Sequence, residues 1–195
     1  CTPEKIIQDA EAIGLTAVAL CDHNTIAGLP EFLNSAKDKN VIAIPGVEIT
    51  SDYMGKEIHI VGLFIKEKNF DELNTFLENI QFEKDTHNYK LYKKLVAAGY
   101  NISYDNIVTS GKKGTVNRVQ FAKELIRCGY ISTVDEAFNG VLSEEYGIYE
   151  PGKREDGIEV IRLLKSLSIV SVLAHPFSSL NDSELDSFLP LAKAN

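Results

Sequence analysis

The chain of 195 residues contains 44% hydrophobic and 25% charged residues, which is typical of one soluble globular domain or of one domain carrying an insertion. Its net charge of −8 argues against broad binding to a phosphate backbone, although bound metal ions can still attract a small phosphorylated substrate. No apolar run is long enough to span a membrane, no signal peptide is visible, and the scattered Cys1, Cys21 and Cys128 favour a reducing cytoplasm over a disulfide framework.

The first third of the sequence alternates between helical and strand patterns. Apolar residues recur at helical spacing in the first segment, where Pro3 suits a first turn and Gly14 follows as a stop. A short apolar run then predicts a buried strand, and the alternation repeats. The predicted order is helix 3–14, strand 16–21, helix 28–40 closed by Asn40, strand 41–50 and strand 57–65. This order predicts an α/β fold with parallel strands.

The pattern changes near residue 66. Helical stretches at 69–99, 115–129 and 132–142 are joined by a loop-rich connector at 100–114, and no convincing buried strand occurs between residues 66 and 155. The α/β pattern then resumes with helix 154–167, strand 168–176 and helix 182–195. We therefore predict an α/β domain in two parts, residues 1–65 and 156–195, interrupted by a helical insertion at 66–155.

Four polar residues share one kind of position, at the end of a predicted buried strand or within one. His23, Glu48 and His175 follow apolar strand residues, and His59 lies inside strand 57–65. In a parallel α/β barrel, catalytic residues come from the carboxyl ends of several strands, and His and carboxylate ligands suit Zn, Mn or Fe. Three of the four histidines fall in strand segments, so the joint pattern predicts a metal site.

Each of these residues also has a purely structural interpretation. A single His at a strand end is more often a hydrogen-bonded turn residue than a ligand, and Glu48 could be a solvated strand end or a helix-cap partner. We expect Asp22 to support His23 from outside the ligand set, because a carboxylate near a ligating His commonly fixes its tautomer. We expect His87 to be a solvated helix residue and Cys21 to be a core thiol.

Taken together, the motifs resemble the PHP (polymerase and histidinol phosphatase) superfamily and, within it, the stand-alone metal-dependent phosphoesterases. The stretch "TAVALCDHNT" is similar to the family's strand ending in T-D-H-D/N-T. The stretch "IPGVEITSDYMGKEIHIVGLFI" is similar to its G-x-E-I-S/T segment followed by a strand carrying H-I-L/V-G, and "SVLAHPF" to its A-H-P strand. The stretch "GTVNRVQFAKELIRCGYISTVDEAFNGVL" resembles the family's G-R-P-H-I-A-x-x-L insertion segment and the helix after it. The resemblance covers nearly the whole chain.

This resemblance implies a distorted (β/α)7 TIM-like barrel of the PHP type, incomplete in this chain, with the helical insertion as its cap. It makes His23, Glu48, His59 and His175 metal ligands, with Glu48 as the bridge between two ions. It also implies two or three divalent ions of Mn, Zn or Fe as cofactors. The implied activity is hydrolysis of a phosphoester through a metal-activated water, without a protein nucleophile.

The sequence departs from the family pattern at both ends and in the insertion. The family's opening H-x-H strand and closing D-x-H strand are not present in it, so the resemblance implies a fragment with an incomplete site, weak metal binding and no activity by itself. Gln120 stands where the family's insertion often has His beside an Arg. Arg118 is expected to hold a substrate phosphate in a bidentate contact, with Gln120 as a second substrate-binding candidate.

Three function classes remain open at this point. The leading hypothesis is hydrolysis of a phosphomonoester of a small metabolite or nucleotide. The close alternative is a 5'-3' exonuclease or oligoribonuclease acting on a short oligonucleotide, and the third hypothesis is a non-catalytic PHP-like module. The acidic charge balance favours a small substrate, because long nucleic acid needs a basic track. We expect no membrane partner, and the sequence leaves the oligomeric state open.

Overall fold

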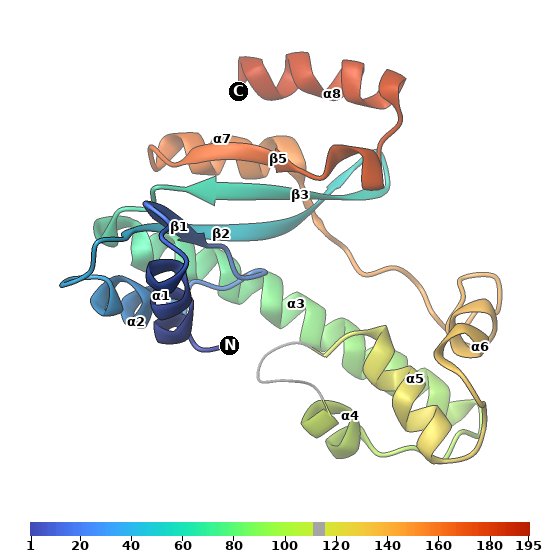
Figure 1. Cartoon of the computed structure of the whole chain (residues 1–195). Helices are drawn as coiled ribbons and strands as arrows, with labels where there is room; N and C mark the ends of the chain where they lie inside the picture. The colour runs from blue at the N-terminus through green and yellow to red at the C-terminus, as the bar shows by residue number, and fades with distance from the viewer. Residues whose placement is uncertain (111–115) are drawn as a thin grey trace. The chain divides into compact units, whose positions relative to one another are not determined.

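The computed structural model describes residues 1–110 and 116–195, which form two compact units (Figure 1). Unit 1 comprises Cys1–Ile80 and Arg154–Asn195, and unit 2 comprises Gln81–Lys153. The second unit begins later than the predicted insertion because the first turns of helix α3, Phe70–Ala97, bury Leu73 and Leu77 in the core of unit 1. Within the described ranges, no helix is both long and apolar enough to cross a membrane.

Unit 1 is built on a mixed sheet whose strands follow the order β1-β2-β3-β5, with the short β4 also paired to β2. The strands are β1 Ala17–Leu20, β2 Ile42–Tyr53, β3 Lys56–Leu63, β4 Glu155–Asp156 and β5 Val170–Ala174. Its helices, besides the start of α3, are α1 Pro3–Ala12, α2 Leu29–Ser35, η1 Glu67–Asn69, α7 Gly157–Ser166, η2 Pro176–Ser178 and α8 Asp182–Ala194. The prediction of an α/β fold is confirmed.

The prediction of uniformly parallel strands is wrong at β3. Strand β1 runs parallel to β2, but β3 runs antiparallel to both β2 and β5. The cause is a two-residue turn at Met54 and Gly55, which have φ values of 55° and 80°. Two successive positive φ angles define the hairpin turn that matches the twist of antiparallel strands, whereas a parallel connection needs a crossover of about a dozen residues. Asp52 Oδ1 stabilises the turn by accepting a hydrogen bond from the Gly55 backbone N at 2.9 Å.

The sheet buries one set of alternating side chains against helices. Val47 and Ile49 in β2, and Ile60 in β3, are fully buried in one hydrophobic cluster. Helix α7 contacts β2, β3 and β5 and contributes Leu164 to the same cluster. Because side chains alternate between the two faces of a strand, the residues between these apolar positions point away from that core. Glu48 and His59 are two of those residues.

Helix α2 is shorter than predicted. It ends at Ser35 and not at the expected cap Asn40, and the backbone continues in turns such as the Lys37 N to Asn34 O hydrogen bond of 3.3 Å. Residues 36–40 comprise one alanine and four polar residues, so they provide little apolar surface to pack against the core. Helical stability in proteins comes mostly from packing of an apolar face, so the helix stops where that face ends.

Unit 2 is helical, and its described residues contain no strand. It contains the second part of α3, α4 Tyr104–Ser110, α5 Arg118–Arg127 and α6 Val134–Asn139, around a core that includes Leu95, Ile107, Phe121, Leu125 and Leu142. The predicted loop-rich connector is wrong over α4, where Ser103 Oγ accepts a hydrogen bond from Asn106 N at 3.4 Å as a helix cap. The end of that predicted connector and the start of predicted helix 115–129, residues 111–115, lie outside the described residues.

Candidate metal centre

The β2–β3 hairpin places Glu48 and His59 on one face of the sheet. In the antiparallel register, Glu48 lies opposite Val61, and His59 lies opposite Thr50, two residues further along β2. Diagonal neighbours on one face of a sheet are within reach of long side chains. The resulting contact is direct, because His59 Nδ1 lies 2.9 Å from Glu48 Oε1.

The segment after β1 is joined to β2 by backbone hydrogen bonds. Glu48 N donates to Asp22 O at 3.0 Å, and Asn24 N donates to Glu48 O at 2.8 Å, so that His23 pairs with Glu48 as an isolated parallel bridge. Asn24 has a φ of 53°, and its side chain exchanges two hydrogen bonds with Thr50. This tight turn brings His23 Nε2 to 3.5 Å from Glu48 Oε2.

The end of β5 adds a second histidine beside His59. Ala174 pairs with His59 across the sheet, and His175 follows it with a φ of 28°. The Ser178 hydroxyl donates to the His175 carbonyl at 2.7 Å, and its oxygen is 2.8 Å from His175 Nδ1. Since that hydroxyl proton is already used, the oxygen is free to accept a proton from Nδ1. The same contact turns Nε2 of the His175 ring toward Glu48 Oε1, 3.2 Å away.

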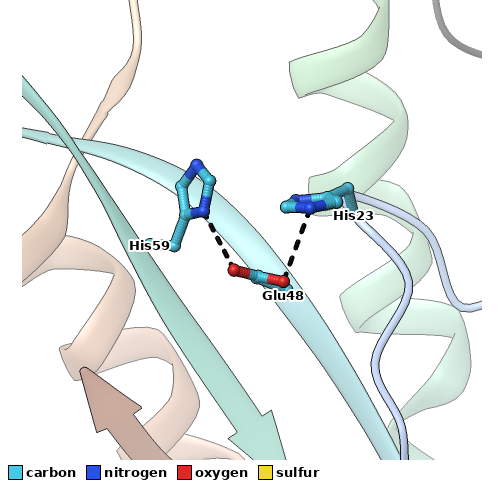
Figure 2. A group of neighbouring side chains, drawn as sticks. All are labelled: His23, Glu48 and His59. Carbon is cyan, nitrogen blue, oxygen red and sulfur yellow. Dashed lines mark hydrogen bonds and ion pairs between the residues drawn. The ribbon is translucent and has the colours of Figure 1, made fainter. Parts of the chain in front are cut away.

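The two oxygens of Glu48 face different histidines. Figure 2 shows His23 and His59 on either side of this carboxylate. Ligand atoms of His23, Glu48 and His59 all lie within 4.8 Å of one another, and His175 extends this group through Glu48 and His59. The structure therefore brings together all four residues that the sequence suggested as ligands.

The electrostatic environment keeps Glu48 ionised. Partial burial favours its protonated form, but the charge of the neighbouring His23 and the close contacts with His175 and His59 outweigh burial and lower the pKa of the Glu48 carboxyl. Cys21 shows the opposite behaviour. Burial, followed by the negative charges of Glu48 and Asp22, raises the pKa of its thiol, so it is a protonated thiol at neutral pH and not a thiolate ligand.

The donor set fits a divalent metal ion. Glu48 Oε1, His59 Nδ1 and His175 Nε2 form a triangle with sides of 2.9, 3.1 and 3.2 Å. Ligand atoms at about 2.1 Å from one ion lie roughly 3.0–3.4 Å apart in octahedral or tetrahedral geometry. Two imidazole nitrogens and a carboxylate oxygen this close together need a proton or a cation between them, and histidine with carboxylate is a ligand set for Mn, Zn or Fe.

The other predicted site residues have identifiable roles in the fold. The Asp22 carbonyl accepts the hydrogen bond from Glu48 N, and among the described residues no hydrogen bond joins the Asp22 carboxylate to the His23 ring. In unit 2, Gln120 Oε1 accepts a hydrogen bond from Asn117 N at 2.9 Å in the capping box of α5. The Arg118 guanidinium carbon lies 4.3 Å from the centre of the Tyr149 ring.

His87 is not the solvated residue that the sequence suggested. Its ring lies against Gly152 and edge-on to Tyr149 in unit 2, and burial lowers the pKa of its imidazole. The polar appearance of the surrounding helix concealed this contact, because the chain segment that covers His87 lies about sixty residues further along the sequence.

Sequence reasoning also missed Glu57, whose Oε1 lies 3.3 Å from His59 Nε2. The signal was present in the strand "EIHIVGLF", since residues two apart on a strand share a face. Its second partner, Arg154, is 97 residues away in the sequence and could not be assigned from spacing.

One face of this mixed sheet thus carries a cluster of three histidines and one carboxylate, an arrangement that could hold a metal ion. The family model described as the PHP domain matches residues 1–147, and the chain belongs to this family. The family resemblance inferred from the sequence motifs is therefore confirmed.

Similar proteins include two phosphate-handling enzymes. The chain is 29% identical over 175 residues to a 5'-3' exoribonuclease of Haemophilus influenzae, covering 90% of this chain and 63% of that protein. It is 24% identical over 176 residues to a 3',5'-nucleoside bisphosphate phosphatase of Chromobacterium violaceum, covering 90% of this chain and 61% of the relative. The chain thus spans less than two thirds of the length of these two curated relatives.

A solved structure supports the fold. A candidate metal-dependent phosphoesterase from Bifidobacterium adolescentis superposes with a TM-score of 0.74 at 24% identity, over 97% of this chain and 69% of that chain. At this identity the likeness concerns the fold.

Proposed function

We propose that the protein is a metal-dependent phosphoesterase. The observation that carries this proposal is the convergence of Glu48 Oε1, His59 Nδ1 and His175 Nε2 within 3.2 Å of one another. His23 faces the other oxygen of the same carboxylate. With histidines facing both of its oxygens, Glu48 would be able to help hold two ions.

His23, Glu48, His59 and His175 are the ligands in this proposal, and Mn, Zn or Fe are the candidate metals, as two or three ions. When bound, such ions supply a water nucleophile at neutral pH and neutralise the oxygens of a phosphoester. Histidine nitrogen and carboxylate oxygen suit all three metals, so the donor set supports the class of ion and leaves its identity to measurement.

The chain's own residues prepare the centre. Glu48 stays ionised because its histidine neighbours outweigh its burial. The hydrogen bond between His175 and Ser178 holds one ring with Nε2 directed at Glu48. Asp22 is proposed to support the site from outside the ligand set, by positioning the Glu48 backbone through its carbonyl oxygen. These contacts hold the ligand atoms before any metal arrives, which reduces the reorganisation that binding requires.

We infer that the full-length protein closes a distorted (β/α)7 barrel of the PHP type around this centre and acts in the cytoplasm. Unit 2 is proposed to be the insertion that selects the substrate, with Arg118 as its phosphate contact. Gln120 is the weaker candidate, because the capping box of α5 already uses its side chain.

The proposed substrate is a phosphoester of a nucleotide, either a phosphomonoester on a small molecule or the 5' end of a short RNA. Both kinds of chemistry occur among the similar proteins, which include an exoribonuclease and a nucleoside bisphosphate phosphatase. The whole chain carries a net charge of −8, and this acidity supports the smaller substrate.

A substrate panel on the full-length protein tests these proposals. We expect hydrolysis of p-nitrophenyl phosphate and of a nucleoside bisphosphate, loss of activity with a chelator, and recovery on adding Mn²⁺. Stepwise release of mononucleotides from a 5'-phosphorylated RNA would identify the exoribonuclease instead. Hydrolysis that is unaffected by the chelator contradicts the metal mechanism, and binding without turnover of any substrate would support a non-catalytic module.

A further inference from the structure

The two nitrogens of the His59 ring face two different carboxylates. Nδ1 lies 2.9 Å from Glu48 Oε1, inside the candidate metal centre. Nε2 lies 3.3 Å from Glu57 Oε1, which is two residues earlier on β3 and on the same face of the sheet. A neutral imidazole carries only one N–H, so only one of these carboxylates can receive it.

The position of that proton decides whether His59 can bind a metal through Nδ1. If the proton is on Nε2 and is donated to Glu57, the Nδ1 lone pair points at the same region as Glu48 Oε1 and His175 Nε2. If it is on Nδ1, Glu48 accepts it and the ring has no lone pair toward the centre. Ligating histidines commonly donate their other N–H to a carboxylate, which fixes the tautomer.

Glu57 is itself held in place by Arg154. Arg154 Nε donates to Glu57 Oε2 at 3.0 Å, and its Nη1 lies 3.6 Å from Asp52 Oδ2. Asp52 and Glu57 are opposite one another in the hairpin, so one guanidinium spans both strands. The next residues form β4, which pairs with β2 at Ser51 and Asp52 and fixes the backbone beside Arg154.

We propose that Glu57, oriented by Arg154, is the positioning residue that keeps His59 in the metal-binding tautomer. This inference rests on the proposed metal-dependent function. Glu57 acts through His59 and does not bind the ion, since the carboxylate oxygen that contacts His59 is on the side of the ring opposite Nδ1. The chain of contacts Arg154–Glu57–His59–Glu48 thus connects the residue at which the chain re-enters unit 1 to the candidate metal centre.

The test uses the full-length protein labelled with ¹⁵N-histidine, and it has two readouts. Nitrogen chemical shifts of the metal-free protein report the His59 tautomer, and isothermal titration calorimetry reports the Mn²⁺ dissociation constant. Wild-type protein should show the proton on Nε2. Glu57→Ala should move the proton toward Nδ1 and weaken Mn²⁺ binding about tenfold. This factor is at the low end of the range for losing a hydrogen-bond partner of a ligand, because the Glu57 side chain is half exposed.

Three further variants separate positioning from charge. Glu57→Gln keeps an acceptor oxygen and should retain the wild-type tautomer, with Mn²⁺ binding between that of wild type and Glu57→Ala. Arg154→Ala should shift the tautomer and the affinity in the same direction as Glu57→Ala, and it replaces that variant if Glu57→Ala does not fold. Glu11→Gln is the matched control, because it removes a carboxylate from an exposed ion pair with Lys39 elsewhere in unit 1, and it should leave the Mn²⁺ affinity within twofold.

Two results overturn the proposal. One is an unchanged tautomer and affinity in Glu57→Ala. The other is an equal loss of affinity in Glu11→Gln, which would mean that any lost negative charge has the same effect. A wild-type protein that binds no Mn²⁺ would reject the proposed function, while the tautomer in the metal-free protein would still decide whether Glu57 positions His59.

Discussion

The two units of this chain differ in composition. Unit 1 contains three of the four histidines and nineteen acidic against ten basic residues. Unit 2 contains nine acidic against ten basic residues and seven of the eight tyrosines. The acidity of the whole chain therefore belongs to the unit with the candidate metal centre. Unit 2 is close to neutral and rich in tyrosine, and the net charge of the whole chain conceals this difference.

The two units also differ in the groups that surround a largely buried carboxylate, Glu124 in unit 2 and Glu48 in unit 1. Glu124 in unit 2 has a side chain that is 3% exposed, and Arg127 contacts both of its oxygens at 2.6 and 2.7 Å. Glu48 in unit 1 is 16% exposed, and the side chains that contact it are histidines. A carboxylate that is paired with an arginine already has its counter-charge within the fold. A carboxylate surrounded by imidazoles can still accept a cation, and this distinguishes a candidate site from a structural ion pair.

The largest expected effect comes from replacing Glu48 by Gln. The amide keeps the shape of the side chain but loses the negative charge that faces the three histidines. We expect the phosphoesterase activity of the full-length protein to fall about a thousandfold, or about 4 kcal/mol of transition-state stabilisation. The melting temperature of the metal-free protein should change little. Steady-state hydrolysis and circular dichroism measure the two quantities.

Glu124→Gln is the matched comparison, since it makes the same chemical change in unit 2. Its activity at a temperature where the protein is folded should stay near that of the wild type. Wild-type rates in Glu48→Gln, or an equal loss of activity in both variants, would show that the difference between the two carboxylates does not reflect metal binding.

The next effect is on the stability of unit 2. The Arg127 hydrogen bonds, opposed by burial and assisted by the Ser103 backbone N–H, lower the pKa of Glu124 from 4.5 to about 2. Because the folded pKa lies below the unfolded value, the stabilisation is complete above about pH 4.5 and is lost as the pH falls toward 2. At neutral pH we expect Glu124→Gln to lower the free energy of unfolding by about 2 kcal/mol, from the weakened contacts with Arg127, Ser103 and Asn106.

Chemical denaturation at pH 7 and pH 3 measures this effect. The difference between wild type and Glu124→Gln should shrink at pH 3, because the wild-type carboxyl has then lost part of its advantage. A difference that is the same at both pH values would mean that the shape of the side chain, and not its charge, stabilises this part of the helical unit.

The sequence predicted much of the fold because its signals were local. Alternating apolar segments located β1, β2, β3 and β5, and the long helix α3 and the helical character of residues 81–153 were also visible. The direction of β3 was missed because it depends on two backbone angles at Met54 and Gly55. Methionine rarely adopts a positive φ, so the dipeptide Met-Gly gives a weaker hairpin signal than Asn-Gly.

The sequence identified the residues of the candidate site but not the contacts among them. His23, Glu48, His59 and His175 could be selected because each stands in or after an apolar strand and matches a family motif. Their geometry depends on contacts between segments up to 127 residues apart, as for His175 and Glu48, which periodicity cannot supply. The partial burial of His87 was missed for the same reason.

A smaller effect is expected from Arg118, which is proposed to bind a substrate phosphate. Its guanidinium carbon lies 4.3 Å from the centre of the Tyr149 ring and 4.9 Å from that of Phe138, which restricts its position. Arg118→Ala should raise KM about tenfold with kcat nearly unchanged, because it removes binding that is equal in the ground and transition states. Steady-state kinetics on a nucleoside bisphosphate measures both constants.

Tyr149→Phe is the control for this change, since it preserves the ring face beneath Arg118 and should leave KM within twofold. If Arg118→Ala lowers the melting temperature but not the apparent affinity for substrate, then Arg118 is a structural residue of unit 2, and the substrate contact must be sought elsewhere.

The smallest effect concerns His87, the histidine of unit 2. Its Nε2 is buried and has no hydrogen-bond partner among the described residues, and burial lowers the pKa of its imidazole from 6.5. Because the unfolded chain takes up a proton more readily than the folded one, the wild type should lose stability as the pH falls below about 6.5. His87→Leu should change the free energy of unfolding by less than about 1 kcal/mol at pH 7.5 and should remove this pH dependence.

The neighbouring Asn88 provides the contrast within the same helix. Its amide donates to Val116 O at 3.1 Å, so Asn88→Leu should lower stability by about 1–2 kcal/mol at every pH. Thermal unfolding between pH 5.5 and 7.5 distinguishes the two residues. If the pH dependence of stability persists in His87→Leu, it arises from other groups, such as the histidines of unit 1. His87 would then not distinguish the stability of unit 2 from that of unit 1.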